Sequence, residues 1–232
     1  MAKKYEFTGA VHPVYRYLKR IRALVDIPLH GIKAGDMGGW LEGEHNLSHD
    51  GACWVCDNSI VQTKATVTDD AVVIYASRVG GSASVRDTAI VAYKSEVGYY
   101  ARIQEEAHIC DLTSVRGNAV VKGRTIISGG SVIYGHAVIK DRACISGNVH
   151  VYEYATVSNE ARVIASGNPT LSNTAIHLCN DVHVGGQLVL ETPGIYDSVR
   201  SLPNYVFRGV LHGDNADHML SLSLLNQLIF KK

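Results

Sequence analysis

Cysteine and histidine are the residues of this chain best suited to metal binding or redox chemistry. The chain has 5 cysteines and 11 histidines, and Cys53 and Cys56 form a CxxC motif. Side chains alternate along a strand, so we expect Cys53 to point inward and Cys56 outward, which opposes a shared metal ion or a redox pair. The four histidines nearest the C-terminus lack the spacing of helical metal ligands. We therefore expect structural cysteines and no metal site.

Tyrosine and histidine side chains suggest a recognition surface. Tyr134 and Tyr152 are separated by three hexapeptides, as are His136 and Tyr154, so a coil of that length would stack their rings. Rigid amphipathic rings are typical of protein interfaces, where they bury area at little entropic cost. Alternatively, stacked rings only stabilise a column of strands. The residues of this predicted cluster are Tyr99, Tyr100, Tyr134, His136, His150, Tyr152 and Tyr154.

Basic residues gather on a second predicted face. They indicate either a local site for an anion, such as a nucleotide, a coenzyme or an acidic protein, or a solvated face that keeps the molecule soluble. Glu105, Glu106 and Asp141 offset part of this charge. The basic residues are Arg86, Arg102, Lys122 and Lys140, followed at the next corner by Arg124 and Arg142.

A six-residue repeat must position all of these side chains. Nineteen consecutive hexads place Val or Ile at every sixth residue from Val55 to Val163, and a small residue such as Ala65 comes two positions earlier. Three hexads make one coil, and its strands pair in parallel with those of the next coil. Pairs such as Asp69-Asp70 suit the corners. The sequence predicts an all-β fold, a β-helix of about seven triangular coils.

One face of this β-helix is expected to be apolar on its outside. An exposed sheet face is normally polar, so an apolar column implies that something covers it. We expect the C-terminal helix or a second subunit to dock there. We also expect the protein to be a homo-oligomer, either a dimer or a trimer. The docking residues are Trp54, Val72, Ile74, Ile90 and Ile126 on the column and Leu220, Leu224 and Leu228 on the helix.

The segments outside the repeat are predicted to close the β-helix. Residues 1–50 suggest a β cap of antiparallel strands, because an open end exposes apolar side chains and an unpaired strand edge. The repeat occupies residues 51–191 and is irregular at 165–173. Residues 192–232 read as a strand followed by an amphipathic helix.

The overall charge excludes several classes of function. Lys and Arg total 22, Asp and Glu total 22, and the formal net charge is zero. The overall charge of the protein therefore does not attract nucleic acid or an anionic membrane. The segment from Met1 to Val25 contains no continuous apolar stretch, so we expect no signal peptide and a cytoplasmic location.

The rule of an aliphatic residue preceded two positions earlier by Ala, Ser or Thr resembles the hexapeptide-repeat, left-handed parallel β-helix family. More narrowly, residues 33–55 and the irregular hexads after them are similar to a group of bacterial and phage proteins. These proteins are often labelled as transferases but are functionally uncharacterised. The sequence of residues 33–55 is KAGDMGGWLEGEHNLSHDGACWV. The likeness covers about residues 5–190. It implies the left-handed sense of the coil.

The same resemblance implies an alternative activity. Hexapeptide acyltransferases are typically trimers that bind acyl-CoA between subunits, and a histidine is their general base. In this chain His136, beside Tyr134, or His150 would remove the proton from an acceptor hydroxyl or amine. The sequence departs from that family because its hexads contain no extruded loop, and glycine follows the aliphatic residue only at Gly80 and Gly98 in the 19-hexad run.

Taken together, the residues favour a non-enzymatic interaction or scaffold protein without a cofactor. A flat face of the β-helix would bind a bacterial protein complex. The likeness to phage proteins implies an inhibitor or accessory factor that acts on a protein complex of the bacterial host. This implication rests on likeness of fold and not on a shared site. The alternative is a CoA-dependent acyltransferase.

Overall fold

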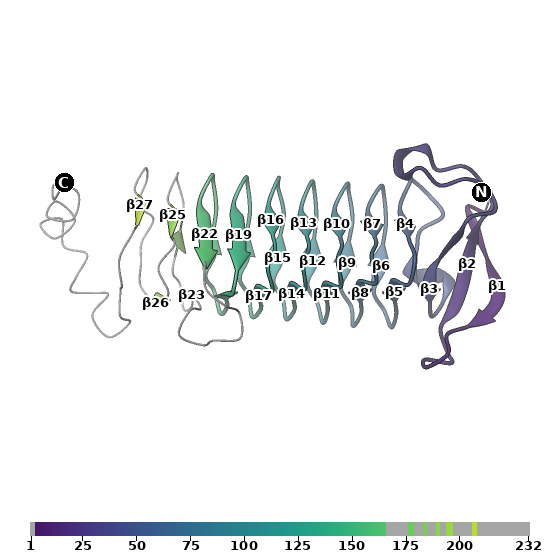
Figure 1. Cartoon of the computed structure of the whole chain (residues 1–232), viewed down its shortest axis with the longest axis horizontal. Coiled ribbons are helices and arrows are strands. Elements are labelled where there is room, and N and C mark those ends of the chain that lie inside the picture. The colour runs from purple at the N-terminus through teal and green to yellow at the C-terminus, as the bar shows by residue number, and fades with distance from the viewer. Residues whose placement is uncertain are drawn as a thin grey trace, which may run out of the picture.

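The protein is an elongated β-helix with its N-terminal segment folded over one end (Figure 1). The computed structural model describes residues 3–165 and the strands at 176–178, 183–184, 189–190, 194–196 and 206–207. The strands fall into three sheets. Each coil contributes one short strand to every sheet, and β4 to β24 make about seven coils. The predicted fold class is confirmed, whereas the left-handed sense of the coil stays a prediction from the resemblance.

The first sheet is called the β4 face, after the strand that begins it. Through most of its length each strand pairs in parallel with the strand one coil further along the chain, for example Val91 with Ile109. It carries the predicted apolar column on its outside. Its strands are β4 (Trp54–Val55), β7 (Val72–Val73), β10 (Ile90–Val91), β13 (His108–Ile109), β16 (Ile126–Ile127), β19 (Cys144–Gly147), β22 (Arg162–Ala165), β25 (Val189–Leu190) and β27 (Val206–Phe207).

The second sheet is called the β5 face, and it carries the tyrosines and histidines. It continues from the N-terminal strands, because β3 (Met37–Leu41) pairs in parallel with β5. Its coil strands are β5 (Ile60–Val61), β8 (Arg78–Val79), β11 (Glu96–Val97), β14 (Ser114–Val115), β17 (Val132–Ile133), β20 (Val149–Val151), β23 (Ile176–Leu178) and β26 (Gly194–Tyr196).

The third sheet is called the β6 face, and it carries the predicted basic column. Arg102 pairs with Val120 and Ile103 with Val121, so the register of three hexads also holds here. Its strands are β6 (Thr66–Val67), β9 (Ser84–Val85), β12 (Arg102–Ile103), β15 (Val120–Val121), β18 (Val138–Ile139), β21 (Thr156–Val157) and β24 (His183–Val184).

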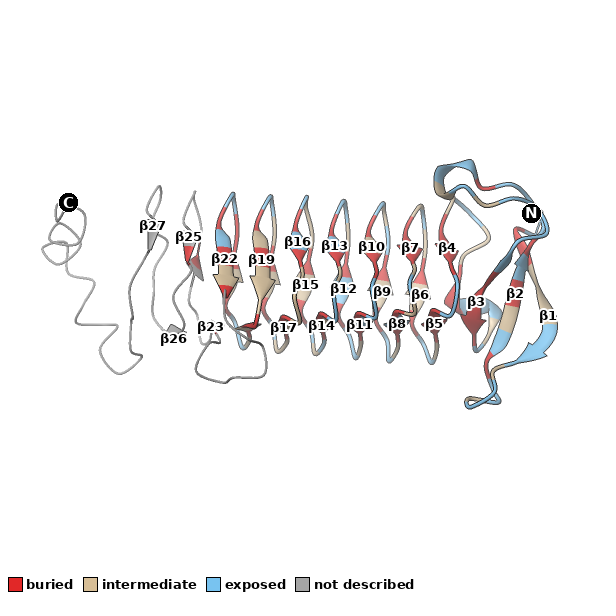
Figure 2. Ribbon diagram, in the orientation of Figure 1, coloured by how far each residue is buried: buried red, intermediate tan, exposed pale blue. Residues whose placement is uncertain are grey.

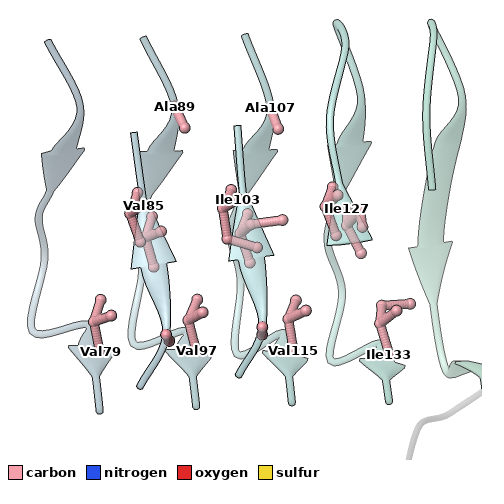
Figure 3. Close-up of a cluster of buried hydrophobic side chains, with 14 of the residues drawn as sticks. Val79, Val85, Ala89, Val97, Ile103, Ala107, Val115, Ile127 and Ile133 are labelled. Carbon is pink, nitrogen blue, oxygen red and sulfur yellow. The ribbon is translucent and has the colours of Figure 1, made fainter. Parts of the chain in front are cut away.

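The aliphatic residue of each hexad fills the centre of the β-helix. Val79, Val97 and Val115 lie directly above one another, with exposed fractions of 0%, 2% and 0% (Figure 3). The small residues Ala89 and Ala107 are also fully buried, near the corners of the coil. Buried residues line the inside of every described coil (Figure 2). This continuous column of buried methyl groups stabilises the coils against one another.

The corners depend on residues that tolerate a left-handed backbone. Asp69, Asp87 and Glu105 stack at one corner with φ of 57°, 60° and 58°. Asp69 accepts the backbone N–H of Asp87 on Oδ2 at 3.2 Å, and Asp87 accepts that of Glu105 at 2.8 Å. Each aspartate therefore bridges to the coil above it, which explains its presence at a corner.

The N-terminal segment forms the predicted cap. β1 (Tyr5–Val11) pairs antiparallel with β2 (Lys19–Ala23), which pairs antiparallel with β3 (Met37–Leu41). Two short 3₁₀ helices, η1 (Pro28–His30) and η2 (Glu44–Asn46), complete it. Tyr5, Ile21 and Leu41 are at most 1% exposed, so the cap joins the core of the coils. It closes one end of the molecule and covers the strand edge there.

In the part of the chain that the structure describes, no helix has the length and apolar character needed to span a membrane. The predicted C-terminal helix, including Leu220, Leu224 and Leu228, lies outside the described residues.

Candidate interaction face

The tyrosines and histidines of the β5 face form stacked pairs, as their spacing predicts. The rings of Tyr134 and Tyr152 are 4.9 Å apart with 6° between their planes, and those of His136 and Tyr154 are 5.1 Å apart at 8°. His150 stacks on His177 at 4.7 Å, and Tyr152 meets His177 edge-on at 6.4 Å. We call these six residues the aromatic ladder. The predicted ring contacts are confirmed, and His177 extends them.

The aromatic ladder lies partly in solvent. Tyr154 is 66% exposed, and His136 beside it is exposed as well. Tyr134 and Tyr152 are half-buried, each following a strand of the β5 face. Parallel strands about 4.8 Å apart hold the rings at stacking distance without any adjustment of the backbone. The surface is therefore rigid, amphipathic and accessible.

Tyr99 and Tyr100 lie at the same corner but outside the aromatic ladder. They are 65% and 63% exposed, and the coil that carries Arg116 and Asn118 separates them from Tyr134 and His136. Tyr100 shares the corner position of His136 and Tyr154, two and three coils away. The structure thus brings six of the seven predicted residues of this cluster to one corner, and the seventh, His150, to the adjoining strand.

Two histidines of the aromatic ladder, His150 and His177, are held towards their neutral form. Burial lowers the pKa of His150 below its ordinary value of 6.5, and His177 and Arg116 nearby lower it further. Burial also lowers the pKa of His177. Nε2 of His150 lies 3.0 Å from Oδ1 of Asn148, an acceptor that favours the tautomer with the proton on Nε2. Two neutral rings stack without repulsion.

A hollow of about 450 Å³ lies on the same face, towards the N-terminal cap. Gly80 and Gly98 form its floor, Tyr99 forms a wall, and Arg78, Glu96 and Arg116 bring charge to it. Arg78 donates to the hydroxyl of Tyr15 at 3.4 Å, and its guanidinium carbon lies 5.4 Å from the centre of that ring. The cap therefore fixes the orientation of one charged wall.

The two histidines that would act as general base in the acyltransferase alternative do not line this hollow. His136 and His150 belong to the aromatic ladder, and neither is among the residues around the cavity. A general base must come within hydrogen-bond reach of a bound acceptor. In the acyltransferase alternative acyl-CoA would bind between subunits, so that alternative stays a prediction.

The basic residues of the β6 face are partly neutralised. Arg124 pairs with Glu106 at 2.9 Å and Arg142 with Glu160 at 3.2 Å, in each case across two adjacent coils. Arg102 is exposed, and Lys122 and Lys140 are half-buried. Exposed ion pairs of this kind contribute little to stability. These ion pairs between coils favour the interpretation as a solvated face.

The apolar column of the β4 face is covered at its N-terminal end by the chain itself. Trp54 is fully buried, with its ring 6.4 Å from that of Tyr5, and Val72 is 7% exposed. These two residues are therefore not available to a second subunit or to the C-terminal helix. The cause is the N-terminal segment, which the repeat does not predict: it reaches the second coil, where Nε2 of His30 lies 3.0 Å from the carbonyl oxygen of Asp70.

The rest of the apolar column is less covered. Ile74 and Ile90 are half-buried and pack against the core, whereas Ile126 is 47% exposed. The docking prediction for Ile74, Ile90 and Ile126 stays a prediction.

The cysteines are single thiols in the described part of the chain, which contains four of them. Cys53 is fully buried, and Cys56 is 7% exposed. Burial raises the pKa of Cys56 to about 12, and burial with Asp111 raises that of Cys110 to about 11. Among the described residues no group of three His, Cys, Asp or Glu side chains is placed to hold a metal ion.

Comparison with known proteins identifies no family and no relative for this chain. No protein-family model matches the chain, and no curated protein matches it at a significant level. Membership of a hexapeptide-repeat family therefore stays an inference from the residues.

The hollow and its charged residues are the feature that sequence reasoning missed. The signal was present, because aligning the coils places Gly80 and Gly98 where Gln62, Arg116 and Tyr134 stand in other coils. A missing side chain in such a column leaves a gap. The contribution of Tyr15 has no such signal, since it comes from outside the repeat.

Proposed function

We propose that this protein is a non-enzymatic interaction protein of the cytoplasm that presents its β5 face to a protein partner. The single observation that carries the proposal is the aromatic ladder, whose outer pair, His136 and Tyr154, is stacked and exposed. Preformed, rigid rings gain contact area on binding with little loss of side-chain entropy. Such residues are frequent among those that dominate the binding energy of interfaces.

The partner we propose is a bacterial protein complex, with the present chain acting as a phage-type inhibitor or accessory factor. Support for this step comes from the resemblance of residues 33–55 to phage proteins. The zero net charge supports a protein partner over nucleic acid. We further propose that the protein is a homo-oligomer, and the exposed Ile126 on the β4 face supports this.

Affinity capture with matched variants tests the proposal. We expect the double variant His136→Ala and Tyr154→Ala to lose the partner that the wild-type protein retains from a host lysate, because it removes the exposed end of the aromatic ladder. Both side chains are exposed, so the fold should be unaffected. Arg102→Ala on the β6 face is the control. If quantitative mass spectrometry finds the same partner at the same level with all three proteins, the proposal is wrong.

A further inference from the structure

The two glycines beneath the hollow are not required by the backbone. A Cβ atom at Gly98 would meet nothing within 4 Å, and one at Gly80 would lie 3.6 Å from the side chain of Gln62, an ordinary contact. Neither glycine has the left-handed φ seen at Gly81, whose Cβ would lie 2.6 Å from the backbone nitrogen of Tyr99. Local geometry therefore explains Gly81 but does not require glycine at positions 80 and 98.

Gly80 and Gly98 directly follow β8 and β11 and continue their pairing, since their N–H groups donate to the carbonyl oxygens of Val97 and Val115, each at 2.9 Å. Glycine in such a paired, extended segment normally weakens it, because it adds backbone entropy and buries no side chain. In the other coils the same position holds a large side chain, for example Gln62, Arg116, Tyr134 or Tyr152. Where glycine occurs in a strand without a bulge or a left-handed turn, close approach of a ligand is a recognised reason. The hollow of about 450 Å³ above these two residues is within the usual range for small-molecule sites.

The walls of the hollow carry unpaired charge and an accessible ring. Within residues 3–165, Arg78, Glu96 and Arg116 take part in no salt bridge. Arg116 stands at one end, two coils from Arg78 at the other, which is about 10 Å at the spacing of parallel strands. The exposed ring of Tyr99 lies one coil from Arg116. Two guanidinium groups against one carboxylate leave the hollow positive.

We propose that this hollow binds a small aromatic oxyanion, either a carboxylate or a phosphate ester on a flat ring. The oxyanion pairs with the guanidinium of Arg116, which offers two parallel N–H donors. The flat ring lies over the floor of Gly80 and Gly98 and packs against Tyr99. Arg78, held by Tyr15, closes the opposite end and adds to the positive field. The site is independent of any protein partner of the aromatic ladder.

The direct test is a titration of the ¹⁵N-labelled full-length protein, followed through its amide spectrum. Phenyl phosphate and benzoate are the probes, at constant ionic strength. We expect saturable shifts of the Gly80 and Gly98 amide signals with at least one probe. Phenol lacks the oxyanion and inorganic phosphate lacks the ring. Each should bind at least about tenfold more weakly, the usual loss for one good interaction.

Three variants and one control locate the ligand. Gly98→Tyr fills the hollow and should abolish the shifts while leaving the melting temperature near that of wild type, because its Cβ meets open space. Arg116→Ala should weaken binding about tenfold or more. Glu96→Gln should strengthen it, since it removes the one negative charge of the hollow. Arg102→Ala, on the β6 face, should change nothing.

Two results would overturn the proposal. One is a folded wild-type protein whose Gly80 and Gly98 signals do not move with either probe. The other is an unchanged titration in Gly98→Tyr and Arg116→Ala, which would place the probe elsewhere.

Discussion

At the scale of single residues, the most unusual contact is that of a buried lysine. Lys4 is only 4% exposed. Its ammonium group donates to the carbonyl oxygens of Asp50 at 3.2 Å and Gly51 at 3.1 Å and lies 3.1 Å from Sγ of Cys53. The first strand of the cap is thereby attached to the loop that begins the first coil. Lysine is almost never fully buried without such partners.

Replacing Lys4 should therefore destabilise the protein. Lys4→Met keeps the length of the side chain but leaves buried carbonyl groups without a donor, so we expect a loss of about 1–3 kcal/mol in the free energy of unfolding. Urea denaturation measures this loss. The neighbouring Lys3→Met is the control, because Lys3 makes only an exposed ion pair with Glu44. Equal midpoints for the two variants would show that the buried contact contributes nothing.

The lowered pKa values of His150 and His177 predict a dependence of stability on pH. The pKa of His150 is lower in the folded protein than its ordinary value of 6.5, so below that pH the unfolded chain binds more protons than the folded one. This contribution to stability is complete above pH 6.5 and is lost as the pH falls through the folded pKa.

We expect the melting temperature of the wild-type protein to fall between pH 7.5 and pH 5.5, about one unit on either side of the ordinary histidine value. The fall should be smaller in His150→Gln, and differential scanning calorimetry measures both slopes. Gly98→Ala, which changes no titratable group, should keep the wild-type slope. A His150→Gln slope as steep as that of wild type would contradict the assignment.

At the scale of elements, the corners fix the geometry of the coils. Gly81 has a φ of 66°, and Gly117 and Gly135 have φ of 71° and 68° at the same corner. In each case the backbone of the next coil occupies the place of a Cβ atom. Thr63, Tyr99 and Glu153 adopt the same left-handed φ at this corner, so glycine is favoured there but is not obligatory.

Substitution of the corner glycine Gly81 should cost much more than substitution of Gly98, which directly follows β11. We expect Gly81→Ala to lose about 1–3 kcal/mol of stability, because it combines a left-handed backbone with a backbone clash. Gly98→Ala has open space and an ordinary φ, so it should be neutral or slightly stabilising. Thermal unfolding compares the two, and a Gly98→Ala variant as unstable as Gly81→Ala would refute this distinction.

The repeat explains which parts of the fold and face were predictable. A period of six residues directly sets a register of three hexads, so the coils and the stacking of Tyr134 on Tyr152 followed from the sequence. The cover over Trp54 did not, because residues 3–50 carry no repeat and their packing depends on tertiary contacts. The burial of Lys4 has the same cause. The hollow was overlooked because its floor consists of absent side chains.

At the scale of the whole molecule, the β-helix is a rigid prism whose three faces differ. The β4 face is largely apolar on its outside, the β5 face carries the aromatic ladder and the hollow, and the β6 face carries basic residues that are partly paired with acidic ones. The cap protects one end from pairing with other strands. We therefore expect assembly to use a face rather than this end, and the exposed Ile126 on the β4 face is the best candidate contact.

Light scattering coupled to size-exclusion chromatography tests this assembly. We expect Ile126→Asp to convert the oligomer to a monomer, since a charge would be buried without a partner in the interface. Thr156→Asp, a half-buried position on the β6 face, should leave the oligomer intact. An oligomer of unchanged mass in Ile126→Asp would exclude this contact.

The most direct test of the central claim, that the β5 face binds a protein partner, is site-specific photocrosslinking in bacterial cells. A benzoyl-phenylalanine is placed at Tyr154 in one protein and at Arg102 in a second, and crosslinked products are identified by mass spectrometry. We predict a discrete heterologous product from position 154 and none from position 102. The absence of a product at position 154, or the same product from both positions, would contradict the account.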